Sequence, residues 1–211
     1  MKKGFMVVFD GSNGAGKTTV IKSVEKHLLS KGFDVLLTRE PGGTPIGEKI
    51  REVILDPSTP EMSFMTELML FGAGRAQHIQ EKIIPALSEG KIVISDRFDA
   101  ATFSFQHFAR GIDLDTIIKI NDLALNGFSP NMNIILDLDP AEGLKRVQNR
   151  GEGLDRLEDE KADFLIRARN GYLKQAEQSP EKFEVIDAAQ SKEKVLEDVI
   201  HVIDVLLGKH L

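Results

Sequence analysis

The segment Gly11-Ser12-Asn13-Gly14-Ala15-Gly16-Lys17-Thr18 constrains this chain most, because it matches the pattern G-x-x-x-x-G-K-[S/T] in full. An apolar run at residues 5–9 precedes it, and apolar residues repeat at helical spacing over residues 19–29 after it. In a loop between a strand and a helix, glycines let successive N–H groups point at phosphate oxygens. The start of the helix adds the positive end of its dipole. The motif predicts a site for a nucleoside triphosphate; the alternative is a glycine-rich turn before a basic helix.

Individual roles follow from the chemistry of this loop. Lys17 is expected to reach the β- and γ-phosphates, and the Thr18 hydroxyl to ligate Mg²⁺. The residues expected to contact the triphosphate are Gly11, Ser12, Asn13, Gly14, Ala15, Gly16, Lys17, Thr18 and Thr19.

Composition limits the partners and the size of the fold. The 211 residues suffice for one well-filled core, and a single domain over residues 1–211 is expected. The net charge of −6 argues against non-specific binding to nucleic acid or to an acidic membrane. The chain has no cysteine, its first apolar run ends at Asp10, and no stretch approaches the roughly 18 apolar residues of a membrane span. We therefore expect a cytoplasmic protein.

Strand-like apolar runs alternate with amphipathic helical patterns, which predicts an α/β, doubly wound parallel sheet. In such sheets, ligands bind at the carboxyl ends of the strands. Strands are expected at residues 5–9, 35–38, 92–95, 133–138 and 183–186, and helices at 17–31, 46–55, 61–89, 113–126, 140–150, 159–177 and 192–207.

Polar residues follow the second predicted strand. Arg39 and Glu40 stand at its carboxyl end, before a Pro-Gly-Gly turn. Arg39 is a candidate for holding an anion, and Glu40 for orienting a hydroxyl or a metal-bound water. Arg51, on the next helix, is a candidate for the same anion. The alternatives are an ion pair within a turn and a solvated charge.

The helix that carries Phe71 and Arg75 also contains two glycines, which a helix disfavours by about 1 kcal/mol each relative to alanine. Phe71 and Arg75 lie four residues apart and share a face. An aromatic plane beside a forked donor favours a purine or pyrimidine site. Alternatively, Phe71 belongs to the core and the glycines allow close helix packing, including across a dimer.

After the third predicted strand, Asp96 is a candidate for holding Mg²⁺ or its waters, and Arg97 for gripping a second phosphate. A structural ion pair between them is the alternative. Thr102, Phe105 and Gln106 follow on the next expected helix, where threonine and glutamine can bond to a base edge.

A glycine-flanked, charged loop at about residues 150–157 has the composition of a mobile lid. Arg146, Arg150 and Arg156 bracket residues 151–155 of this loop and are candidates for offsetting charge on a transferred phosphoryl group. A surface loop with salt-bridged arginines is the alternative.

With these residues assembled, the sequence resembles bacterial thymidylate kinases, a branch of the P-loop nucleoside monophosphate kinases, from residue 5 to about residue 207. The resemblance implies transfer of the γ-phosphate of ATP to dTMP, giving dTDP for dTTP synthesis, with Mg²⁺. It also implies a five-stranded parallel sheet with a short lid, and a homodimer. Besides the phosphate loop, the matching motifs are Thr38-Arg39-Glu40-Pro41-Gly42-Gly43-Thr44, Phe71 with Arg75, Asp96-Arg97, Ala109-Arg110-Gly111-Ile112 and Leu154-Asp155-Arg156.

The resemblance also implies roles for single residues. Phe71 stacks on thymine, and Arg75 donates to a base carbonyl. Thr102 and Gln106 contact the base edge. A last set, Arg39, Arg51 and Arg97, holds the dTMP phosphate. The catalytic set is then Lys17, Asp96, Arg97, Arg150 and Arg156, because the chain resembles the subgroup whose phosphoryl-transfer arginine belongs to the lid.

Three positions depart from the family pattern. Asn13 replaces a usually acidic residue that meets the sugar 3′-hydroxyl, Asp10 stands where glutamate is usual, and Phe105 replaces a tyrosine that packs on the deoxyribose. A GTPase-type switch is the rival from another class, but the chain contains no [Asn/Thr]-Lys-x-Asp guanine signature. A kinase for another nucleoside monophosphate stays open as the alternative.

Overall fold

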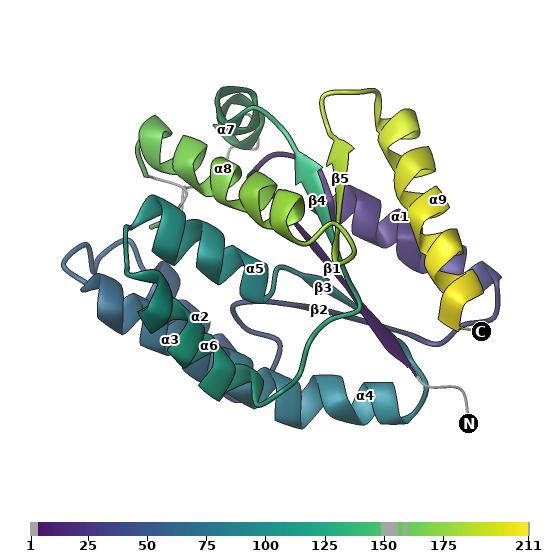
Figure 1. Ribbon diagram of the computed structural model, residues 1–211, viewed down its shortest axis with the longest axis horizontal. Coiled ribbons are helices and arrows are strands. Elements are labelled where there is room, and N and C mark those ends of the chain that lie inside the picture. Colours follow the sequence, from purple (N-terminus) through teal and green to yellow (C-terminus); the bar gives the residue numbers. More distant parts are fainter. Residues whose placement is uncertain (1–3, 149–155, 158–159, 211) are drawn as a thin grey trace.

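Five parallel strands form one sheet in the order β2-β3-β1-β4-β5 (Figure 1). The computed structural model describes residues 4–148, 156–157 and 160–210. All five predicted strands are present, and the α/β class with a five-stranded parallel sheet is confirmed. The strands are β1 (Phe5–Gly11), β2 (Val35–Arg39), β3 (Ile92–Asp96), β4 (Met132–Asp137) and β5 (Phe183–Asp187).

Helices are present at all the predicted ranges as far as the structure describes them, and residues 149–150 and 159 of those ranges lie outside the described residues. Residues 99–109 form two further helical elements outside the predicted ranges. The prediction of one continuous helix at residues 61–89 is wrong. That stretch is divided into an α-helix, a π-helical segment and a second α-helix, and Pro85, which has no N–H to donate, directly follows the change of register. The helical elements are α1 (Lys17–Ser30), α2 (Pro45–Leu55), α3 (Phe64–His78), η1 (Ile79–Ile83), α4 (Ile84–Ser88), α5 (Asp99–Thr102), η2 (Phe103–Ala109), α6 (Leu114–Leu125), α7 (Pro140–Gln148), α8 (Ala162–Gln178) and α9 (Lys192–His210).

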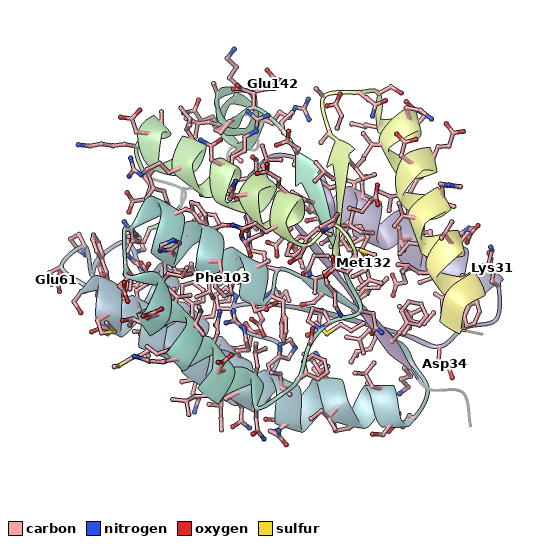
Figure 2. All side chains as sticks on the ribbon, in the orientation of Figure 1. Lys31, Asp34, Glu61, Phe103, Met132 and Glu142 are labelled. Carbon is pink, nitrogen blue, oxygen red and sulfur yellow. The ribbon has the colours of Figure 1, made fainter. Side chains whose placement is uncertain are left out.

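Strand β1 is covered on both faces, which explains its unbroken apolar sequence. Val7 and Phe9 belong to a core that includes α1 and α9, whereas Met6 and Val8 pack with η1 and α4. This is the period-2 alternation of a strand with helices on each side. Figure 2 shows the side chains that fill the space between the sheet and these helices.

The register of the sheet brings the polar segments together at one edge. Asp96 of β3 is paired with Phe9 of β1 and with Arg39 of β2. The next residues continue the pattern, since Arg97 N donates to Phe9 O at 2.8 Å and Glu40 N donates to Asp96 O at 2.9 Å. The phosphate loop leaves β1 at the same edge, as expected for a ligand site at the carboxyl ends of parallel strands.

Within the described ranges, no helix combines the length and the apolar composition that a membrane span requires. Since β1, near the start of the chain, lies beside β4 from its second half, the sheet is compatible with the predicted single domain, which stays a prediction.

Candidate active site

A cavity of about 550 Å³ lies at this edge of the sheet. It is lined by the phosphate loop on one side and by residues from β2, α2, α3, β3, α5 and η2 on the other. The predicted site residues that line it are Asn13, Gly14, Gly16, Lys17, Thr18, Thr19, Arg39, Glu40, Arg51, Phe71, Arg75, Asp96, Arg97, Thr102, Phe105 and Gln106.

The remaining predicted residues lie elsewhere. Gly11 and Ser12 line a small cavity behind the phosphate loop, and Ala15 and Asp10 are buried. Arg156 is bound to a carboxylate described below, and Arg150 lies outside the described residues.

The phosphate loop has the conformation that its glycines predict. Gly11, Gly14 and Gly16 have φ values of 119°, 78° and 89°, which are left-handed and favour glycine. Gly16 is the N-cap of α1, which has neither a side-chain cap nor an acidic residue in its first turn. Lys17 Nζ donates to the carbonyls of Gly11 and Ser12 at 3.2 and 3.0 Å. The positive end of α1 is therefore directed at the cavity without an acidic side chain to neutralise it, as an anion site requires.

The donor set for a metal ion consists of oxygens. Thr18 and Asp96 line this 550 Å³ cavity together with Lys17. In the described part of the chain, no cluster of three or more His, Cys, Asp or Glu side chains suited to a metal ion is present. A hydroxyl and one carboxylate fit Mg²⁺, which binds few protein ligands and completes its shell with phosphates and waters.

Arg97 is the most constrained of the predicted site residues. Its φ of 69° is left-handed, a conformation that costs a non-glycine residue about 1–3 kcal/mol. Hydrogen bonds fix the side chain: Nη1 donates to Asp10 Oδ1 at 3.2 Å and to Tyr172 OH at 2.8 Å, and Nη2 donates to Asn13 Oδ1 at 2.5 Å. The guanidinium also lies 5.1 Å from the centre of the Phe105 ring. Arg97 is thus preorganised at the wall of the cavity.

Asp10 is fully buried, and its Oδ1 accepts from Tyr172 OH at 2.7 Å. Burial raises the pKa of Asp10 to about 6, although the charge of Arg97 and the hydrogen bond from Tyr172 act against this rise. The carboxylate that holds Arg97 therefore titrates just below neutral pH.

A second buried network surrounds Glu40. Its Oε2 accepts from Arg75 Nε at 2.9 Å, and its Oε1 lies 3.0 Å from His78 Nδ1. Arg75 also donates to Asn121 Oδ1 at 2.8 Å and to the carbonyl of Phe98 at 3.1 Å. Both carboxylate oxygens of Glu40 are thus occupied by side chains of α3. Its predicted role toward a hydroxyl or a metal-bound water stays a prediction, as does the contact of Arg75 with a base carbonyl.

Arg39 and Arg51 flank the turn that follows β2. Arg39 Nη2 forms an exposed ion pair with Glu48 Oε2 at 2.7 Å, and Arg51 Nη1 donates to Pro41 O at 2.8 Å. Since both arginines line the same cavity as the phosphate loop, the geometry is compatible with their predicted role toward an anion.

Glu67 of α3 is buried and binds three cationic or amide side chains. Its Oε1 accepts from Gln106 Nε2 at 2.9 Å and from Arg110 Nε at 3.2 Å. Its Oε2 accepts from Arg110 Nη2 at 3.1 Å and from Arg156 Nη2 at 2.5 Å. Arg156 was predicted as a lid arginine at the transferred phosphoryl group. In the structure its side chain is bound to Glu67 of α3 and also donates to Ile54 O. Its predicted catalytic role stays a prediction.

Sequence reasoning missed Glu67, His78 and Tyr172. A signal was present for the first two, because residues 67, 71, 75 and 78 recur at spacings of four, four and three and so share the face of α3 that carries Phe71 and Arg75. Tyr172 is the only tyrosine in the chain, which is a weak signal. Its partners are Asp10 of β1 and Arg97, which directly follows β3, and both lie more than 70 residues away in the sequence.

Comparison with known proteins identifies the family. A family model described as Thymidylate kinase matches residues 9–199. A thymidylate kinase of Geobacillus sp. (strain WCH70) is 48% identical over 194 residues, which are 92% of each chain. A thymidylate kinase of Bacillus pumilus is 43% identical over 98% of each chain, and that of Clostridium novyi is 42% identical over 94% of this chain and 98% of its own. This chain belongs to the thymidylate kinase family.

Proposed function

We propose that this protein transfers the γ-phosphate of ATP to dTMP and releases ADP and dTDP. The observation that carries the proposal is that a single cavity is lined both by the phosphate loop and by the Arg39, Arg51 and Phe71 side chains. One cavity thus offers a site for a triphosphate and a site for a second ligand that carries both an anionic group and an aromatic ring. The family and the names of the relatives support the same reaction.

The acceptor needs orientation rather than deprotonation. The second pKa of a phosphate monoester is near 6, so dTMP is mostly a dianion at neutral pH. The site must therefore align two anions and offset their repulsion. We assign that task to Lys17 on the donor, and to Arg39, Arg51 and Arg97 on the acceptor.

Thr18 and Asp96 are the residues that would hold Mg²⁺, which neutralises charge on the phosphates when bound. We expect Asp96→Asn to reduce kcat strongly even at saturating Mg²⁺, and removal of divalent ions with EDTA to abolish turnover. An Asp96→Asn variant with near-wild-type kcat would contradict the role given to this carboxylate.

The base site is assigned to Phe71, Thr102 and Gln106. Phe71 is half-buried and lines the cavity, which suits a stacking ring. Thr102 Oγ1 is buried and has no hydrogen-bond partner among the described residues. A base edge would satisfy this hydroxyl, since buried polar groups are normally paired.

A coupled assay of ADP release with dTMP, dUMP, dCMP, dGMP and AMP as acceptors tests the reaction. We expect turnover to depend on the acceptor and to be highest with dTMP. The methyl group of thymine adds only about 1–3 kcal/mol of preference, so dUMP should be turned over more slowly. ATP consumption at the same rate with and without dTMP would contradict the proposal.

Three further proposals accompany this function. Arg150, together with Arg156 when released from Glu67, contacts the transferred phosphoryl group. The protein acts in the cytoplasm. It forms a homodimer through α3 and α6, which pack on each other through Gly72 and Ile120 and expose several large apolar side chains, Phe64, Met65, Met69, Leu114, Ile118 and Leu123.

A further inference from the structure

Glu67 is placed where it controls the orientation of a side chain in the base site. Gln106 is 1% exposed, lines the cavity and donates from Nε2 to Glu67 Oε1 at 2.9 Å. The two ends of an amide side chain differ, since the nitrogen only donates hydrogen bonds and the oxygen only accepts them. The partner of one end therefore decides which end is offered to a ligand.

Glu67 stays ionised, so that it can only accept. Burial opposes its ionisation, but hydrogen bonds from Arg110 and Gln106, the charge of Arg110 and the hydrogen bond from Arg156 outweigh burial and lower its pKa. An ionised carboxylate can form a hydrogen bond only with the nitrogen of the amide, because the amide oxygen is an acceptor as well. The Nε2 of Gln106 must therefore face Glu67, and its Oε1 must face the other way.

The cavity then offers a fixed polarity. Among the described residues, the side-chain hydrogen bond of Gln106 is the one from Nε2 to Glu67, and it leaves Oε1 as the end of the amide that can accept from a ligand. Arg75 lines the same cavity, and a guanidinium can only donate. A donor and an acceptor in the same cavity can complement the C4 carbonyl and the N3–H of thymine or uracil. Cytosine presents the reverse pattern, an amino donor beside an unprotonated N3.

We propose that Glu67 determines pyrimidine specificity by holding the Gln106 amide with its oxygen toward the base, so that the site accepts an imide edge and rejects cytosine. This inference rests on the proposed function and deepens it. Glu67 acts through Gln106 and is a positioning residue. The competing explanation is purely structural, namely that Glu67 only anchors Arg110 and Arg156.

A double-mutant cycle separates these explanations. The readout is the ratio of kcat/KM for dTMP to that for dCMP, with dissociation constants for both nucleotides from titration calorimetry. Glu67→Gln places an amide opposite Gln106 and allows both orientations. We expect the ratio to fall by about 10- to 100-fold, the effect of one mispaired buried polar group.

In the background of Gln106→Met, which has no amide to orient, Glu67→Gln should leave the ratio unchanged. An equal loss of ratio in both backgrounds, or no loss in either, would overturn the proposal. Glu160→Gln is the matched control, because Glu160 binds Arg110 but not Gln106. Its ratio should equal that of the wild type, and a fall as large as that of Glu67→Gln would overturn the proposal as well.

If Glu67→Gln does not fold, Gln106→Met tests the step on which the proposal depends, namely that the Gln106 amide discriminates between the bases, and it leaves the ion pairs of Glu67 intact. Its ratio should fall, and an unchanged ratio would overturn the proposal. The wild-type protein distinguishes this failure from failure of the proposed function. If the proposed function is wrong, the wild-type protein shows no dTMP-dependent ADP release. If only the inference about Glu67 is wrong, the wild-type protein shows this release, and the variants have the same dTMP to dCMP ratio of kcat/KM as the wild type.

Discussion

Arg97 illustrates what a single residue contributes to this site. Its position after β3 follows from the sequence, since a carboxylate and an arginine directly after a buried strand indicate a phosphate site. The hydrogen bonds that fix the Arg97 side chain do not follow from the sequence, because the partners Asp10, Asn13 and Tyr172 come from β1, the phosphate loop and α8. Local patterns thus located the functional group, whereas the contacts that fix it depend on tertiary structure.

Tyr172→Phe tests whether Asp10 controls Arg97. Protonated Asp10 loses the charge that attracts Arg97, so kcat/KM should fall as the pH drops through about 6. The Tyr172 hydroxyl lowers the pKa of Asp10. Its removal should raise that pKa and move the acid limb of the kcat/KM profile up by about one pH unit, the equivalent of one hydrogen bond to a charged group.

At pH 8, where Asp10 is ionised in both proteins, the remaining difference should be the pH-independent loss of the hydrogen bond from Arg97 Nη1 to the Tyr172 hydroxyl. Titration of the substrate phosphate affects both proteins equally, so the difference between their profiles isolates Asp10. The phenylalanine keeps the ring that meets Phe105 edge-on. Coincident acid limbs would contradict the control of Arg97 by Asp10.

At the scale of elements, the sequence predicted the strands and most helices because their apolar periods are long and regular. It did not predict the π-helical segments η1 and η2. The second carries Phe105 and Gln106, so the exact direction of two site residues depends on a local change of helical register. Gly171 of α8 fits closely against η2, where an added Cβ would lie 2.9 Å from the Phe108 ring.

The contact between the phosphate loop and α7 gives the first prediction at this scale. A Cβ on Gly143 would lie 2.2 Å from the backbone carbonyl of Asn13, so Gly143→Ala must displace α7 or the loop. We expect the KM for ATP to rise, and the free energy of unfolding to fall by about 1–3 kcal/mol. Gly208→Ala on α9 is the control, because an added Cβ there meets nothing within 4 Å. It should leave both quantities at wild-type values or slightly raise stability.

Glu40 connects the end of β2 to α3, and its removal should destabilise the fold. Its ion pair with Arg75 is buried, with the two side chains 5% and 1% exposed. Glu40→Gln leaves a buried arginine without its countercharge, so the free energy of unfolding from urea titration should fall by about 3–5 kcal/mol. Glu48→Gln is the comparison, since its pair with Arg39 is 40% and 53% exposed. It should cost less than about 1 kcal/mol. Equal losses would show that burial of the pair is irrelevant.

At the scale of the whole molecule, the order β2-β3-β1-β4-β5 places the phosphate loop centrally, with the acceptor residues of β2 and β3 on one side of it. The alternation of strands and helices predicts a parallel sheet, and the family resemblance implies that it has five strands, but neither predicts the order of the strands. Neither period nor propensity specifies which strands are neighbours, because that choice depends on how the helices cover both faces.

The proposed homodimer provides the last prediction. Met69 of α3 is 57% exposed, and Ile118 and Leu123 of α6 are exposed as well. A stable dimer would remove such side chains from water, a gain of about 25 cal/mol per Å² of apolar surface.

The wild-type protein should therefore have the mass of a dimer in size-exclusion chromatography with light scattering. Met69→Glu, which places a charge in this face, should shift the mass toward that of a monomer. Val205→Glu changes an equally apolar, exposed residue on α9, across the sheet, and should leave the dimer intact (Figure 1). A monomeric wild-type protein would contradict the homodimer. A dimer that dissociates with Val205→Glu but not with Met69→Glu would place the interface elsewhere, because only an interface formed by α3 and α6 makes Met69 sensitive to substitution.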